Sequence, residues 1–153
     1  MAHWISKHII DELLNNENYK TGDYHTALKE TFLALDKRMA TEEETEVLKT
    51  MAKELTKDKD GRMQAGSTAT TVLITPDKII CANAGDSRTV ISKRGGEPQA
   101  LSKDHKPELE LERKRIEAAN GHVQNGRVNG TLAVSRALGD FSYKWQPELE
   151  PTK

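Results

Sequence analysis

The first part of the chain has the hydrophobic pattern of a helix. Ile5, Ile9 and Leu13 recur at every fourth position. Residues with this spacing lie on one face of an α-helix, so the pattern predicts a helix over residues 2–14. The next residues, 15–20, are polar and show no such period, which favours a loop.

Two further helices are predicted from the same spacing and from residues suited to helix ends. Asp23 precedes an apolar stripe that continues to about residue 39, and an aspartate side chain can accept a hydrogen bond from a backbone N–H of the first turn. Thr41 and Glu44 have the spacing of a capping box, in front of another stripe that reaches residue 55. A charged connector, residues 57–62, follows.

The pattern then changes to β-branched runs. Residues 70–75 and 78–84 lie on either side of Pro76-Asp77, which suits the centre of a turn. A third run, residues 88–92, follows Gly85-Asp86-Ser87. These runs predict an antiparallel meander of three strands. Residues 79–82 do not alternate, which predicts a strand that is covered on both faces.

The last part of the chain mixes both patterns. Residues 98–101 suggest an edge strand, and a charged helix is expected over 107–119, with Pro107 as its first residue and Asn120-Gly121 as its stop. Residues 122–128 predict a hairpin with a type I′ turn. The fold class is therefore α+β, with an antiparallel β-sheet flanked by helices.

Composition excludes several classes of protein. The chain has 153 residues, enough for one domain, and a net charge of −1, which gives no support for a nucleic-acid partner. No apolar run reaches the roughly 18 residues needed to span a bilayer, so no membrane association is expected. Its one cysteine, Cys81, excludes an internal disulfide and favours an intracellular location, in the cytoplasm or nucleus.

Four motifs carry a family resemblance. They are AGSTATTVLI (65–74), ANAGDSRTVIS (82–92), LSKDHKPELELERKRI (101–116) and GRVNGTLAVSRALGD (126–140). In this order the chain resembles the metal-dependent protein serine/threonine phosphatases of the PP2C type. The resemblance implies a single partial domain over residues 1–153, with an incomplete PP2C-like β-sandwich. It also implies that residues 103–130 form a mobile flap beside the active site.

The resemblance implies one metal ligand, Asp86. In the family, the aspartate of this Gly-Asp-Ser-Arg motif contributes to an additional Mg²⁺ or Mn²⁺ position beside the main metal pair, and a carboxylate held at a strand end suits such a hard cation. The alternative is that Asp86 only stabilises a turn through backbone amides. Ser87 and Arg88 are expected to be structural. The substrates implied are phosphoserine and phosphothreonine proteins, dephosphorylated by a metal-bound water.

Other parts of the family's site are missing from this sequence. The family's first metal-binding acid lies in an Asp-Gly-His-Gly-Gly motif, which is absent, and Asp60-Gly61 in the charged connector does not replace it. No catalytic residue and no other cofactor-binding residue is therefore assigned. We expect an incomplete phosphatase domain that is inactive in isolation, whose unpaired sheet edges favour self-association. The alternative is a non-catalytic binding or regulatory module.

Three other features have competing interpretations. Arg136 lies in a small apolar run and needs a partner, for which Asp140 and Asp86 are candidates. His105 is expected to have a structural role. The basic residues between 103 and 115 alternate with glutamates, which is typical of a solvated helix face, although phosphoprotein docking is the alternative. These glutamates are Glu108, Glu110, Glu112 and Glu117.

Overall fold

A computed structural model describes residues 1–56, 65–144 and 149. The chain divides into two compact units. The first, here called the helical unit, comprises Met1–Ser67 and Leu138–Trp145, and the second, the hairpin unit, comprises Thr68–Ala137 and Gln146–Lys153. The charged connector with Asp60 lies outside the described residues. Within the described part of the chain, no helix is long and apolar enough to cross a membrane.

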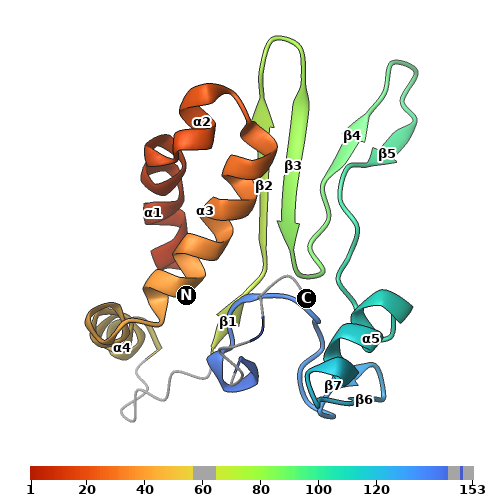
Figure 1. Ribbon diagram of the computed structural model, residues 1–153. Helices are drawn as coiled ribbons and strands as arrows, with labels where there is room; N and C mark the ends of the chain where they lie inside the picture. The colour runs from red at the N-terminus through yellow and green to blue at the C-terminus, as the bar shows by residue number, and fades with distance from the viewer. Residues whose placement is uncertain (57–64, 145–148, 150–153) are drawn as a thin grey trace. The chain divides into compact units, whose positions relative to one another are not determined.

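Four helices form most of the helical unit: α1 (Ala2–Asn15), α2 (Glu17–Thr21), α3 (Tyr24–Met39) and α4 (Glu42–Thr56). α1 and α3 lie side by side (Figure 1), and α3 also contacts α2 and α4. The three helices expected from hydrophobic spacing are thus confirmed. Their shared apolar core consists of Trp4, Ile5, Ala27, Leu28, Leu35, Met39 and Leu48.

The short helix α2 lies where the sequence predicted a loop, so that prediction was wrong. Asn16 caps the helix, because its side-chain oxygen accepts the backbone N–H groups of Asn18 and Tyr19 at 2.9 and 3.3 Å. Gly22 ends it with a left-handed φ of 89°. The helix buries no side chain, so the sequence has no apolar period here from which the helix could have been predicted.

A small ladder completes the helical unit. β1 (Gly66–Ser67) pairs antiparallel with β8 (Leu138–Gly139), which the 3₁₀ turn η1 (Phe141–Tyr143) follows. The Asp36 carboxylate of α3 accepts the Gly139 N–H at 2.7 Å and pairs with the Lys144 ammonium group at 2.7 Å. α3 is therefore bonded to a segment about a hundred residues further along the chain.

Two hairpins begin the hairpin unit. β2 (Ala69–Ile74) and β3 (Ile79–Ala84) pair over six residues, and β4 (Val90–Ser92) pairs with β5 (Pro98–Ala100). The strands and the turn at Pro76-Asp77 agree with the prediction from the sequence, but the predicted three-stranded meander is wrong. Among the described residues, β3 and β4 belong to separate two-stranded sheets. The segment between them bonds residues 102–106 instead.

The expectation that β3 is covered on both faces is also wrong. None of its six residues is fully buried, and Ile79 is 46% exposed. Within the described part of the chain, β3 has β2 as its one paired strand. Its apolar run therefore has less cover in this unit than a central strand would have.

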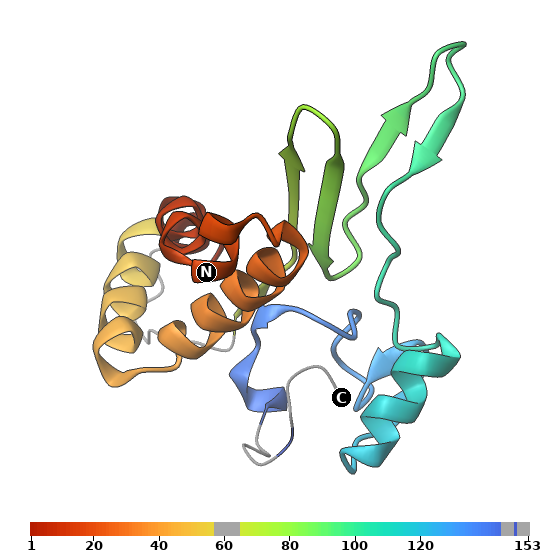
Figure 2. The ribbon, with the colours of Figure 1, turned by 45° about the horizontal axis from the view of Figure 1, so that its top comes forward.

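The remainder of the hairpin unit is a helix with a second small hairpin. α5 (Glu110–Ala118) begins three residues after Pro107, which is buried in the preceding turn. Asn120 supplies the expected left-handed stop at φ 58°. β6 (Val123–Gln124) and β7 (Arg127–Val128) follow, with β6 against α5 (Figure 2), and positive φ at both turn residues confirms the type I′ turn. The predicted α+β class is confirmed; the single domain over residues 1–153 stays a prediction.

Candidate functional site

Two of the motif segments pair with each other at the end of β3. The backbone N–H of His105 donates to the Gly85 carbonyl at 2.9 Å, and the Gly85 N–H donates back to His105 Nδ1 at 3.1 Å. The Asn83 side chain donates to the carbonyls of Gly85 and Lys103, both at 3.1 Å. We call this paired structure, residues 83–88 with 102–106, the Gly-Asp corner. It fixes the backbone on either side of Asp86.

Glycine is required at position 85 for two reasons. Its φ of 107° lies in the region that side chains disfavour, and a Cβ there would lie 2.4 Å from Cγ2 and 2.8 Å from Cβ of Thr68. The Thr68 hydroxyl in turn lies 2.9 Å from the Ser87 hydroxyl. Ser87 therefore makes a structural contact, as expected from the sequence.

Asp86, the predicted metal ligand, forms an ion pair with Lys106 across the corner. The Lys106 ammonium donates to the Asp86 carboxylate at 2.5 Å. This hydrogen bond raises the pKa of Lys106 above its ordinary value. Both side chains are about one-third exposed, at 31% and 38%, so solvent screens the pair and the carboxylate remains accessible.

A second ion pair crosses the corner with the charges reversed, because here the basic residue lies in the segment of residues 83–88 and the acid in that of 102–106. Arg88 donates from two nitrogens to the two carboxylate oxygens of Asp104, each at 2.9 Å. These hydrogen bonds hold the pKa of Asp104 below its usual value. The planar guanidinium of arginine matches a carboxylate in this geometry. The two parallel hydrogen bonds therefore fix the orientation of the two side chains as well as stabilising the pair. Arg88 thus has a structural contact, again as expected.

His105 is held as a neutral hydrogen-bond acceptor. Burial lowers its pKa, and the nearby positive charge of Arg136 lowers it further. A neutral ring leaves Nδ1 free to accept the Gly85 N–H, because only one ring nitrogen then carries a proton. These contacts agree with the structural role expected from the sequence.

Arg136 has a different partner from either candidate that the sequence suggested. Its guanidinium donates to the Glu112 carboxylate at 2.8 to 3.0 Å, rather than to Asp140 or Asp86. Glu112 is 3% exposed, so the expectation that it belongs to a solvated helix face is wrong. Although burial favours the neutral acid, the hydrogen bonds from Arg136 and the charge of Arg115 hold the pKa of Glu112 below its ordinary value.

A signal for Glu112 was present in the sequence. It lies four residues before Ile116, the other buried side chain of α5, and residues at this spacing share one helix face. Arg136, in its small apolar run, required an acidic partner. Taken together, the two requirements single out Glu112 among the glutamates of this stretch.

Asp140 belongs to the helical unit and has its own setting there. Its φ is 49°, and its N–H donates to the Ala65 carbonyl at 3.1 Å. Burial raises the pKa of its carboxyl group. The carboxyl also lies against Gly66, where a Cβ would overlap it.

The described residues do not form a complete set of metal ligands. No group of three or more histidine, cysteine, aspartate or glutamate side chains lies close enough together to hold a metal ion in residues 1–56, 65–144 and 149. Asp86 has the donor chemistry that a hard cation needs, an accessible carboxylate on a fixed backbone, but it belongs to no such group among these residues. We therefore derive no catalytic step through a metal from these residues alone.

Comparison with known proteins first gives the structural class. The structure of a phosphatase from Toxoplasma gondii superposes on this chain over 97% of this chain and 55% of its own length, with a TM-score of 0.59 and 24% identity. The α+β layout is thus shared with part of the fold of a known phosphatase.

Sequence comparison then gives the family. The family model of protein phosphatase 2C matches residues 1–151. The chain is 44% identical to "Probable protein phosphatase 2C 3" of Paramecium tetraurelia, over 100% of this chain and 49% of that protein. It is 42% identical to "Protein phosphatase 2C homolog 2" of Schizosaccharomyces pombe, over 100% and 37% respectively. The chain belongs to the protein phosphatase 2C family, and it spans about half the length, or less, of these curated relatives.

Proposed function

We propose that this chain supplies one part of the active site of a metal-dependent protein serine/threonine phosphatase, with phosphoserine and phosphothreonine proteins as substrates. Membership of the protein phosphatase 2C family supports this reaction class. The observation that carries the proposal is the Gly-Asp corner, where two family motifs pair and present an accessible carboxylate.

In this proposal, Asp86 is a ligand for Mg²⁺ or Mn²⁺. Such cations supply an activated water and stabilise the charge that develops on a phosphoryl group. The chain's own contribution is to hold Asp86 on a backbone fixed by His105 and Gly85. The described residues form no group of three or more side chains that could hold a metal ion. We therefore propose that the isolated chain is inactive.

A non-catalytic role is the second candidate, and one observation favours it. The Asp86 carboxylate is already paired with Lys106, and the described residues do not place it in a group of three or more side chains that could hold a metal ion. A domain with this site would keep the scaffold of a phosphatase and serve as a binding or regulatory module.

A chimera separates the two functions. Residues 65–140 of this chain would replace the matching segment of the Paramecium relative, and Mn²⁺-dependent hydrolysis of a phosphothreonine peptide would be measured. The phosphatase proposal predicts an active chimera whose activity falls about tenfold or more with Asp86→Asn. Asp77→Asn, in an exposed turn, is the control and should retain activity. A folded but inactive chimera would favour the non-catalytic module.

We also propose that the chain is intracellular and self-associates through its open sheet edges. Ile74 of β2 is 72% exposed, and β2 and β3 form a sheet of two strands among the described residues. Sedimentation velocity should show a dimer or larger species whose fraction rises with concentration. Ile74→Lys should reduce that fraction, whereas Ile10→Lys, at a position 65% exposed on α1, should not. A monomer at all concentrations would contradict self-association.

A further inference from the structure

Glu112 is a buried carboxylate in the hairpin unit, and two arginines converge on it. Arg136 contacts both carboxylate oxygens, at 2.8 to 3.0 Å, and Arg115 contacts Oε2 at 3.1 Å. Glu112 and Arg115 are on α5, whereas Arg136 lies 24 residues beyond Glu112. A single carboxylate thus ties α5 to the segment that follows the small β6–β7 hairpin.

The contacts continue from this cluster towards the Gly-Asp corner. Arg115 donates to the Ser135 carbonyl at 2.5 Å. The Ser135 N–H donates to the His105 carbonyl at 3.1 Å. His105 then exchanges two hydrogen bonds with Gly85, the residue before Asp86. An unbroken series of hydrogen bonds therefore joins Glu112 to the backbone that carries Asp86.

We propose that Glu112, with Arg115 and Arg136, is a positioning device that fixes His105 and hence the Gly85–Asp86 backbone. The segment around Ser135 bonds the corner through the Ser135 N–H, and α5 reaches that segment through the Arg115 side chain. The buried carboxylate holds both arginines in one orientation, because paired charges in a dry setting are directional. Glu112 acts through His105 and is not a catalytic residue.

This inference deepens the proposed function and rests on it in one respect. If Asp86 is a metal ligand, the positioning couples the flap segment, residues 103–130, to that ligand. The positioning itself is a property of the chain alone. It can therefore be tested without metal or substrate. Failure of the chimera experiment would remove this coupling and leave the positioning intact, so that the two failures are distinguishable.

Amide hydrogen exchange in the full chain, followed by NMR, is the test. Glu112→Gln keeps the shape of the side chain and removes its charge. We expect the Gly85 and His105 amides to exchange about tenfold faster in this variant. Two reference amides in the same unit should not change: Thr75, bonded to the Lys78 carbonyl, and Val128, bonded to that of Leu132.

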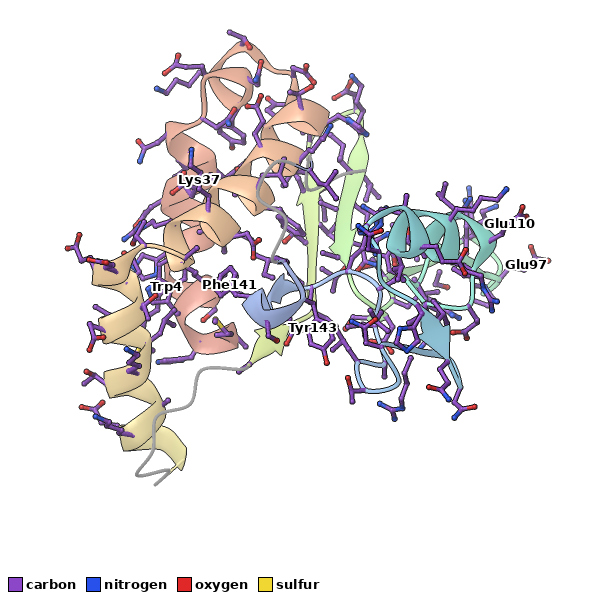
Figure 3. All side chains as sticks on the ribbon, turned by 60° about the horizontal axis from the view of Figure 1, so that its bottom comes forward. Trp4, Lys37, Glu97, Glu110, Phe141 and Tyr143 are labelled. Carbon is purple, nitrogen blue, oxygen red and sulfur yellow. The ribbon has the colours of Figure 1, made fainter. Side chains whose placement is uncertain are left out.

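The matched control is Glu110→Gln on the same helix. Glu110 lies on the outer side of α5 (Figure 3), and its ion pair with Lys114 is exposed, so no amide should change by more than about twofold. Equal acceleration of all four amides by Glu112→Gln would show a general stabilising role and overturn the proposal. Unchanged exchange at Gly85 would overturn it as well.

If Glu112→Gln does not fold, Arg136→Lys decides by the same criteria. A lysine keeps the charge but cannot bond both carboxylate oxygens in a fixed fork. Faster exchange at Gly85 and His105, with unchanged Thr75 and Val128, again supports the positioning role, and any other pattern contradicts it.

Discussion

The helical unit and the hairpin unit are stabilised by different interactions. In the helical unit, Trp4, Leu28, Leu35 and Met39 are at most 1% exposed and meet in one apolar core. Trp4 (Figure 3) also makes polar contacts at the edge of this core. Its indole N–H donates to Glu44 at 2.8 Å, and the Arg38 guanidinium lies over its ring. Burial of apolar surface is the main source of stability here.

In the hairpin unit, the buried side chains are of another kind. Among the described residues of this unit, the buried apolar side chains are Ile116, Val128 and Pro107, and the charged Glu112 is buried as well. Paired ions and backbone hydrogen bonds hold the Gly-Asp corner. The unit with the candidate site thus depends on charge and on backbone geometry, which are more sensitive to pH and to single atoms than an apolar core is.

The largest effect is expected from a cavity in the helical unit. Leu35 is fully buried, so Leu35→Ala should lower the free energy of unfolding by about 2–5 kcal/mol. Urea denaturation followed by circular dichroism measures this change. Leu14→Ala, at a position 48% exposed on α1, should stay within about 0.5 kcal/mol. Similar losses in both variants would refute an apolar core centred on α3.

A smaller effect is expected from an added methyl group in the hairpin unit. Gly85→Ala meets both the positive φ and the close approach of Thr68, and should cost about 1–3 kcal/mol. Gly95→Ala is the matched control, since its φ of 109° is similar but nothing lies within 4 Å of the added Cβ. The difference between the two variants, measured by urea denaturation, isolates the contact with Thr68. Equal losses would mean that this contact contributes nothing.

The smallest effect is a dependence of stability on pH between 7 and 5.5, which should arise from His105 in the hairpin unit. The pKa of His105 is lower in the folded chain than its ordinary value of 6.5, so the unfolded chain binds a proton first as pH falls. Stability is therefore present above about pH 6.5 and is lost as pH falls through the folded pKa, with a slope of at most about 1.4 kcal/mol per pH unit. His105→Asn, which retains an acceptor near Nδ1, should flatten the slope between pH 7 and 5.5. An unchanged slope would exclude His105 as its source.

The same contrast explains which features the sequence could predict. Helix α3 follows from Asp23 and from an apolar stripe, because both signals are local. The β6–β7 turn follows from Asn125-Gly126 for the same reason. Asp86 was recognised by its motif, and its assignment as a metal ligand stays a prediction.

What the sequence did not predict depends on partners distant along the chain. Lys106 meets Asp86 across 20 residues, and hydrophobic spacing carries no information about this pair. The spacing from Ile116 marks Glu112 as a buried position, but it does not give the orientation of Arg136, 24 residues away. The expected pairing of β3 with β4 failed for a related reason. The residues between these strands bond the segment around His105, a choice that local turn chemistry does not specify.

The central claim is that Asp86 is a metal ligand held by the Gly-Asp corner, and Mn²⁺ titration of the full chain followed by NMR tests it most directly. Bound Mn²⁺ broadens the signals of nearby amides, even when binding is weak. The account predicts that the amides of Gly85, Asp86 and Ser87 broaden first, and that Asp86→Asn abolishes this broadening. Broadening that begins at the acidic first turn of α4, or that persists at the corner in Asp86→Asn, would contradict it.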